Sequence, residues 1–287
     1  MKLKFSIRKK RISRSAGGDF ANFVFILISA AFMALPLVLI TCNALKPLSE
    51  LFIFPPRFYV RYPTLDNFRD LIILMSESWV PFSRYLANSL SVVILGTGGH
   101  VIIASLGAFV VSKYDFPGKK FFSAMVLLSL MFAPQVTRIP TYMIMAKIGW
   151  VNTLTSLIIP AWQYSLGFYL MSKFMGQIPD AILEAATIDG ASKWRIFWSI
   201  VMPYVKPAWL TLIILSFQML WADTGSFYIY SEAIKPLPNA LFQIAAGGIA
   251  RTGINAVVMF LMMLVPVTLF LFNQSKIVET MGTSGID

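Results

Sequence analysis

Residues 180–207 read DAILEAATIDGASKWRIFWSIVMPYVKP, a long hydrophilic segment between two uncharged apolar runs in the second half of the chain. Its pattern predicts two short helices separated by a turn. Asp180 follows Pro179 at the position of a helix N-cap, and Glu184 lies in the first turns, where the helix dipole favours an acid. Gly190 supplies a turn that other residues resist.

The second of these predicted helices carries an apolar stripe. Trp194, Phe197, Trp198 and Val201 recur at i, i+3, i+4 and i+7, the spacing of one helix face. Pro203 then marks the return to the next apolar run. A compact pair of helices on a membrane surface is typical of a docking element for a partner in solution.

The segments around this loop are those of a membrane protein. Hydrophobic residues make up 57% of the chain and charged residues 13%, whereas a soluble domain carries about 25% charged residues. The apolar residues lie in long runs without charge, as membrane-spanning helices require. We therefore expect an all-α polytopic fold with six transmembrane helices, at residues 20–45, 87–112, 121–137, 148–172, 208–222 and 252–273.

The basic residues predict how these helices are oriented. Fifteen of the 24 Lys and Arg residues lie in segments that this threading places inside, and five of the other nine lie in the long first loop, residues 46–85. Basic loops stay in the cytoplasm, so both termini are predicted inside and residues 46–85 and 223–251 outside. The first apolar run follows a basic head, as in a signal peptide, but it is long enough to span. Topology thus explains the net charge of +11 without a nucleic-acid partner. We expect a single transmembrane domain over residues 1–287, with a cytoplasmic basic N-terminus (1–19), a cytoplasmic loop (180–207) and a cytoplasmic tail (274–287).

Motifs for chemistry are sparse. The sequence contains no G-x-x-x-x-G-K-[ST] phosphate-binding loop and no nucleophile motif beside its single histidine, His100. We therefore expect no enzyme, no metal and no cofactor on this chain, with ATP handled by a partner. One cysteine, Cys42, permits no internal disulfide. His100 lies inside a predicted span, where it is either a proton relay or a neutral, hydrogen-bonded side chain; the lack of acids in the predicted spans favours the second.

The loop 180–207 resembles a loop that is typical of a known family. Glu184-Ala185-Ala186, followed by Gly190 and Pro203, is similar to the EAA loop of binding-protein-dependent ABC importer permeases. The form EAATIDGAS resembles the sugar-permease branch, which includes the smaller permease of the maltose importer. The segments 64–71 (TLDNFRDL), 86–90 (LANSL) and 139–159 (IPTYMIMAKIGWVNTLTSLII) resemble the same branch in the same order.

The resemblance implies a type I ABC importer permease fold in the plasma (inner) membrane of a bacterium. It also implies four kinds of partner: a second homologous permease chain, two ATP-binding subunits that carry ATP and Mg, an extracytoplasmic sugar-binding protein, and the lipid membrane. Transport would proceed by alternating access. Matched by position, the residues that couple to the ATPase are Glu184, Ala185, Ala186, Asp189, Gly190 and Ala191. The segment 279–285 resembles a tail that inserts between the ATPase subunits in some members, but Asp287 departs from the usual basic ending.

An oligosaccharide is the expected cargo, because aromatic faces and amides suit sugars. The residues that we expect to line its pathway are Trp162, Gln163, Tyr164, Gln218, Trp221 and Arg138. The alternative is that the aromatic side chains pack between helices or form an aromatic belt at the membrane interface. We expect Gln163 and Gln218 to face the interior of the bundle, since an amide in an apolar core needs a partner.

The charge of the cargo is a further expectation. Four cations lie at the outer ends of the spans (Arg138, Lys147, Lys235 and Arg251), against Asp223 and Glu232 there. This balance suits a uronate-containing sugar, although lipid headgroups would explain the same charges. Two other functions remain open, namely an ABC permease for a peptide or polyol phosphate and an ion-coupled secondary transporter. The secondary transporter would call for inverted repeats and acids near the midplane, which the sequence does not show.

Overall fold

The structure is a computed structural model that describes residues 16–283, so the basic residues of the segment 1–14 lie outside the described part. All regular elements within residues 16–283 are helical, in agreement with the predicted all-α fold. Three helices are long and apolar enough to cross a membrane, over Gly17–Leu45, Phe82–Lys113 and Ile249–Leu271. They belong to α1 (Ala16–Leu45), α4 (Phe82–Lys113) and α14 (Thr252–Thr283) and match the first, second and sixth predicted spans. The α14 helix continues into the predicted tail as far as Thr283.

Two further candidate spans are bent pairs of helices. The α5 helix (Lys119–Met131) meets α6 (Pro134–Lys147) at 112°. The segment Lys193–Tyr204 meets α12 (Lys206–Ala222) at 79°. The predicted third span, 121–137, therefore ends earlier, and residues 138–147 are helical rather than the outer turn that we expected. The physical reason is Pro134, which suits the first turn of a new helix because it needs no N–H partner there.

The predicted fourth span, 148–172, is divided. It consists of α7 (Thr155–Ala161) and α8 (Ser165–Gly176), with residues 162–164 outside both helices. The three long helices and the two bent pairs give up to five membrane-crossing segments in the described chain. The count of six spans therefore stays a prediction.

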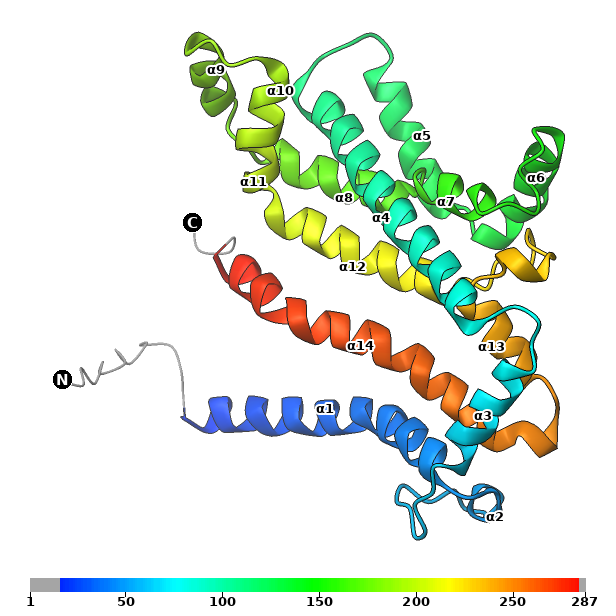
Figure 1. Ribbon diagram of the computed structural model, residues 1–287. Helices are drawn as coiled ribbons and strands as arrows, with labels where there is room; N and C mark the ends of the chain where they lie inside the picture. Colours follow the sequence, from blue (N-terminus) through cyan, green and yellow to red (C-terminus); the bar gives the residue numbers. More distant parts are fainter. Residues whose placement is uncertain (1–15, 284–287) are drawn as a thin grey trace, which may run out of the picture.

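The α4 helix is the central element of the molecule. It packs against α7, α8, α12 and α13, and Figure 1 shows it running diagonally between α5 and α12. Two of its glycines permit this close packing. A Cβ at Gly96 would lie 2.6 Å from Leu220 Cδ1 of α12, and one at Gly99 would lie 2.1 Å from Trp162 Nε1. Small residues such as those of the run Gly96-Thr97-Gly98-Gly99 favour close packing between membrane helices and their neighbours, and the contacts at Gly96 and Gly99 agree with this.

Two separate apolar clusters form the core, and α4 contributes to both. The first contains Tyr85, Leu241 and Ile254 and lies beneath α3 (Asp66–Ser76) and α13 (Leu237–Ala245). The second contains Phe109 and Phe197 and lies beneath the segment 180–207. In the second long loop, α13 ends at Ala245, shortly before the chain turns at Gly248 with φ +80°.

The ends of the helices divide between two sides. In Figure 1 the start of α1, the end of α14 and the segment from α9 (Asp180–Ile188) to α11 (Met202–Tyr204) lie toward the left, whereas α2 (Leu48–Leu51), α3 and α13 lie toward the lower right. This arrangement agrees with the predicted grouping of loops. Which side faces the cytoplasm stays a prediction.

Candidate functional site

The loop 180–207 folds around one glycine turn. The first helix, α9 (Asp180–Ile188), ends as Gly190 N donates to Thr187 O and Ala191 N donates to Ala186 O, both at 3.0 Å. Gly190 has φ +80°, and this pair of bonds around a left-handed residue is a Schellman motif, for which glycine is preferred. The predicted turn therefore lies at the predicted residue.

The start of α9 differs from the prediction. Pro179 occupies the N-cap position, and Asp180 is the first helical residue and caps nothing. Asp180 instead accepts a hydrogen bond from Lys113 Nζ at 2.7 Å, and Lys113 also donates to Ile178 O. The Lys113 side chain is 5% exposed and that of Asp180 75%, so the pair contributes at most about 1 kcal/mol. Its geometric role is to join the end of α4 to the start of α9.

The α9 helix has an anchored face and a free face. Leu183, Ala186 and Ala191 pack against the second apolar cluster. Among the remaining predicted coupling residues, Glu184, Ala185, Asp189 and Gly190 are exposed. Ile188, which we did not predict, is 85% exposed at the tip of the helix.

Two acids of this free face have no partner within the described part of the chain. Among residues 16–283 no ion pair or side-chain hydrogen bond involves Glu184 or Asp189, and their role in coupling stays a prediction. An apolar tip beside unpaired acids is a surface suited to docking. The sequence signal for Ile188 was its position two residues before the turn glycine.

The second helix of the loop is built differently from the expected stripe. It begins with α10 (Lys193–Ile196), whose N-cap Ser192 accepts through Oγ from Arg195 N at 3.3 Å. It continues as a π-helical turn, η1 (Phe197–Val201), and α11 (Met202–Tyr204). Phe197 and Val201 are buried, but Trp194 and Trp198 are exposed. The wider π turn precedes Pro203, which has no N–H to donate to the preceding turn. The π turn shifts the helix face, so the predicted apolar stripe is divided between buried and exposed residues.

Two hydrogen bonds join the break in the fourth span to α4. Trp162 Nε1 donates to Leu95 O at 3.0 Å. His100 is buried, with Nδ1 2.6 Å from Ser216 Oγ and Nε2 3.1 Å from Tyr164 O. A carbonyl oxygen only accepts, so Nε2 carries the proton and donates to Tyr164 O. A neutral ring then accepts at Nδ1 from the Ser216 hydroxyl. This geometry is that of the neutral, hydrogen-bonded histidine; neither ring nitrogen contacts an acid, as a relay would require.

The predicted pathway residues of the fourth and fifth spans differ in burial. Trp221 is buried, donates to Met262 O of α14 at 3.3 Å and stacks on Phe217. Gln163 and Gln218 are exposed, so the prediction that they face the interior of this bundle is wrong. On α12 the inward positions are Ser216 and Leu220, and Gln218 lies half a turn away from both. Whether any of these residues contacts cargo stays a prediction.

Arg138 lies in an aromatic cluster on the predicted outer side. Its guanidinium carbon is 5.4 Å from the centre of the Phe227 ring. Tyr142 lies 5.4 Å from Phe227, edge to face, and stacks on Tyr228 at 6.3 Å. Burial raises the pKa of Tyr228, with Arg138 opposing this rise and Asp223 adding to it. The sequence did not indicate this cluster, since its members come from α6 and from the loop after α12.

The four outer cations are not equivalent. Lys235 is buried, forms an ion pair with Glu232 and donates to Gln243 Oε1 at 3.0 Å. Arg251 donates to Ile244 O at 2.9 Å. The four cations that we expected at the outer ends of the spans are therefore reduced to two, Arg138 and Lys147, both exposed on α6. Within residues 16–283 no group of three or more His, Cys, Asp or Glu could hold a metal ion.

Comparison with known proteins gives no matching family model, but many related sequences. The trehalose/maltose transport system permease MalG of Thermococcus litoralis is 31% identical, over 65% of this chain and 68% of that protein. The arabinooligosaccharides transport system permease AraQ of Halalkalibacterium halodurans is 29% identical, over 70% of both chains. The sn-glycerol-3-phosphate transport system permease UgpE of Pectobacterium atrosepticum is 27% identical, over 92% of this chain and 95% of that protein.

Solved structures show the same fold. A chain of a bacterial ABC transporter involved in import of the acidic polysaccharide alginate superposes with a TM-score of 0.75 at 17% identity, covering 91% of this chain and 98% of that one. A chain of the alginate transporter in complex with its pentasaccharide-bound periplasmic protein gives a TM-score of 0.61 at 14% identity, covering 89% and 93%. The fold, the glycine turn of the loop and the MalG relative agree with the resemblance seen in the sequence: the chain belongs to the permeases of ABC transporters, in the branch of the sugar-transport permeases.

Proposed function

We propose that this chain is one permease subunit of an ATP-driven importer that brings an oligosaccharide from a solute-binding protein into the cytoplasm. The observation that carries the proposal is the free face of α9, an exposed apolar tip with unpaired acids on a helix that is anchored from behind. One of two ATP-binding subunits would dock there, the other would dock on the corresponding loop of a second permease chain, and the two permease chains together would form the pathway. ATP and Mg would bind to the ATPase subunits alone.

The contacts behind α9 suggest how docking would move the membrane helices. Lys113 joins α9 to the end of α4, and α4 in turn holds the break of the fourth span through His100 and the Leu95 carbonyl. A displacement of the docked loop would therefore act on α4 and α8 together. Two discrete arrangements of these helices, biased by ATP, would give alternating access.

The cargo that we propose is an oligosaccharide that carries uronates. The cluster of Arg138, Tyr142 and Phe227 offers exposed aromatic faces and a guanidinium, and such groups bind sugar C–H faces and carboxylates. The relatives that transport arabinooligosaccharides and trehalose or maltose by name support a sugar, and the alginate importer shows that this fold serves an acidic polysaccharide. With Lys235 and Arg251 engaged internally, the acidic preference rests on Arg138 and Lys147.

Copurification and reconstituted uptake test these proposals. Pulldown of the full chain should recover a second permease, an ATPase and a binding protein, and uptake into proteoliposomes should need ATP and resist uncouplers. Uptake that uncouplers abolish would instead indicate the ion-coupled transporter.

The cargo test compares neutral and uronate oligosaccharides with their binding proteins. Arg138→Gln with Lys147→Gln should lower uronate uptake at least threefold, whereas Lys120→Gln, a matched exposed lysine on α5, should not. Normal uronate uptake by the double variant would reject the acidic preference and leave the sugar permease standing. A polyol phosphate is the second candidate, because the glycerol-phosphate permease aligns with 92% of this chain. Uptake of glycerol phosphate but not of sugars would favour it.

A further inference from the structure

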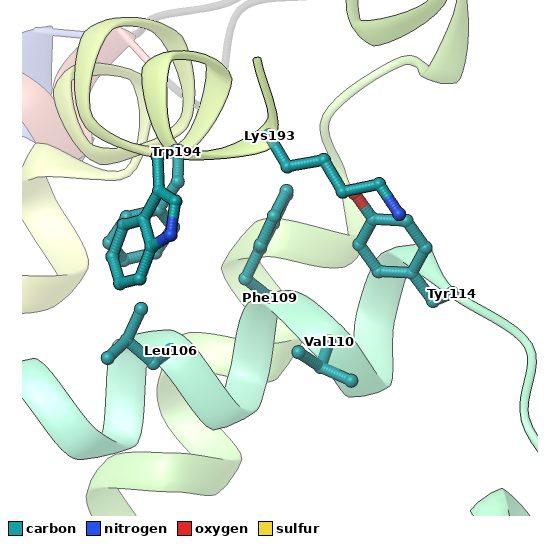
Figure 2. A pocket seen from close by; sticks show the side chains of 7 residues that line it. Leu106, Phe109, Val110, Tyr114, Lys193 and Trp194 are labelled. Atoms are coloured by element: carbon teal, nitrogen blue, oxygen red, sulfur yellow. The ribbon is translucent and has the colours of Figure 1, made fainter.

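A groove unrelated to the predicted pathway opens beside the loop 180–207. It has a volume of about 350 Å³ and lies between the last turns of α4 and the α10–η1 segment. Figure 2 shows Leu106, Phe109 and Val110 rising from α4 on one side, with Lys193 and Trp194 reaching over from the other. Tyr114 and Phe197 complete the lining, which contains no acidic side chain.

One end of the groove is cationic. Lys193 Nζ lies 5.0 Å from the centre of the Tyr114 ring. Among residues 16–283 Lys193 forms no ion pair, and Arg195 follows it two residues later, also exposed. An exposed ammonium above an aromatic ring, in a groove that no carboxylate lines, is suited to an anion.

The other end continues along the surface of a membrane-spanning helix. Ile103, Leu106 and Val110 lie at i, i+3 and i+7 on α4, so they form one stripe. Val110 and Ile103 are each 46% exposed, and α4 is a candidate membrane span over its whole length. A soluble partner cannot follow this stripe into the bilayer, but a lipid chain can.

The aromatic side chains around the groove agree with a place at the membrane surface. Trp194 is 63% exposed, and Trp198 and Tyr204 are also exposed on the same segment. Exposed Trp and Tyr gather where hydrocarbon meets water. The groove therefore combines an apolar stripe inside the bilayer, an aromatic rim at its surface and a cation beyond the rim.

We propose that this groove binds one anionic phospholipid, with its phosphate at Lys193 and an acyl chain along Leu106 and Val110. The site would place a lipid between α4 and the second helix of the coupling loop. The proposal rests on the proposed function only in that anionic lipid would reach it from the cytoplasmic leaflet.

Lipid retention in symmetric bilayers tests the site without ATPase, binding protein or sugar, so its outcome is independent of the transport proposal. The full chain is placed in nanodiscs containing equal amounts of phosphatidylglycerol and phosphatidylcholine, and the retained lipids are counted by native mass spectrometry. The wild type should retain one phosphatidylglycerol in preference to phosphatidylcholine. Lys193→Gln should lower that occupancy about fivefold, the effect of one basic residue near an anionic membrane surface. Lys193→Arg and the matched control Lys120→Gln should keep it.

Two matched variants test the apolar half of the site. Val110→Trp should fill the groove and reduce retention of either lipid. Ile102→Trp should have no effect, because Ile102 is equally exposed on the same helix, at 46%, but does not line the groove. Equal retention of the two lipids by the wild type would overturn the proposal and needs no variant. Equal occupancy in Lys193→Gln and Lys120→Gln would also overturn it. In a separate experiment, loss of the lipid when purified ATPase subunits bind would overturn it too and would assign the groove to protein docking.

Discussion

Gly167→Ala should disrupt the polar contact at the centre of the molecule. Gly167 lies in α8 against His100, where a Cβ atom would come 2.3 Å from His100 Nε2 and 2.5 Å from Leu212 Cδ1. The imidazole cannot simply rotate away, because its two nitrogens are held by Ser216 and the Tyr164 carbonyl. Either α8 must move away from α4 or the ring must leave both partners.

The expected cost follows from these two routes. Overpacking of this kind costs about 1–3 kcal/mol, and each hydrogen bond lost adds about 0.5–1.5 kcal/mol. Gly167→Ala should therefore lose about 1–3 kcal/mol of folding free energy if α8 moves, and about 2–6 kcal/mol if the ring leaves both partners. In a chain of this size this corresponds to a fall in Tm of at least about 2 °C.

Thermal unfolding of the purified chain in detergent measures this loss. Gly176→Ala is the matched control, since Gly176 lies in the same helix and a Cβ there would meet nothing within 4 Å. It should be neutral or slightly stabilising, because alanine favours a helix. The double variant Gly167→Ala with His100→Ala should lose less stability than the sum of the single variants, as expected for coupled neighbours. Equal Tm values for Gly167→Ala and Gly176→Ala would refute the packing argument.

Three further predictions concern the loops. Gly190→Val should abolish ATPase stimulation at normal membrane insertion, because a β-branched residue at φ +80° costs about 1–2 kcal/mol. Gly190→Asn, which tolerates this conformation, should keep much of the stimulation; equal activity in both variants would contradict a strained turn. Burial raises the pKa of Glu232, but hydrogen bonds from Lys235 and Tyr85 and the charge of Lys235 outweigh it and lower that pKa. The ionised carboxylate therefore stabilises the outer loop at neutral pH, and this contribution falls as pH drops below about 4. The difference in Tm between wild type and Glu232→Gln should narrow over that range, and a constant difference would count against it. With Cys42 replaced by Ser, a cysteine at Tyr62 should react with an impermeant thiol reagent outside sealed cells and one at Ile188 should not; the reverse pattern would invert the topology.

Much of the architecture followed from composition and local chemistry. Long uncharged runs predicted α1, α4 and α14, since a bilayer leaves few alternatives to an apolar helix of that length. The turn at Gly190 was predictable because one residue type accepts its backbone conformation. The close packing at Gly96 and Gly99 followed from the same logic of small side chains.

What the sequence did not predict depends on contacts between distant segments. Asp180 looked like an N-cap, but Lys113, 67 residues earlier, takes its carboxylate. From the sequence, Lys235 was one of four cations at the outer ends of the spans, but the fold places it beside Glu232 and Gln243. The outward position of Gln163 depends on where the fourth span breaks, and the π turn before Pro203 divides a stripe that is regular in the sequence.

The two apolar clusters have a mechanical consequence at the level where they meet on α4. The last residue that α4 gives to the first cluster is Val93, and the first that it gives to the second is Val101. Between them stand Gly96, Thr97 and His100, and the Thr97 hydroxyl is buried without a hydrogen-bond partner in the described part of the chain. Interlocked aliphatic side chains resist sliding because they must first separate, whereas hydrogen bonds exchange partners one at a time. A displacement that keeps both clusters intact would therefore have to occur at this level of α4, where the helix contacts its neighbours through small residues and hydrogen bonds.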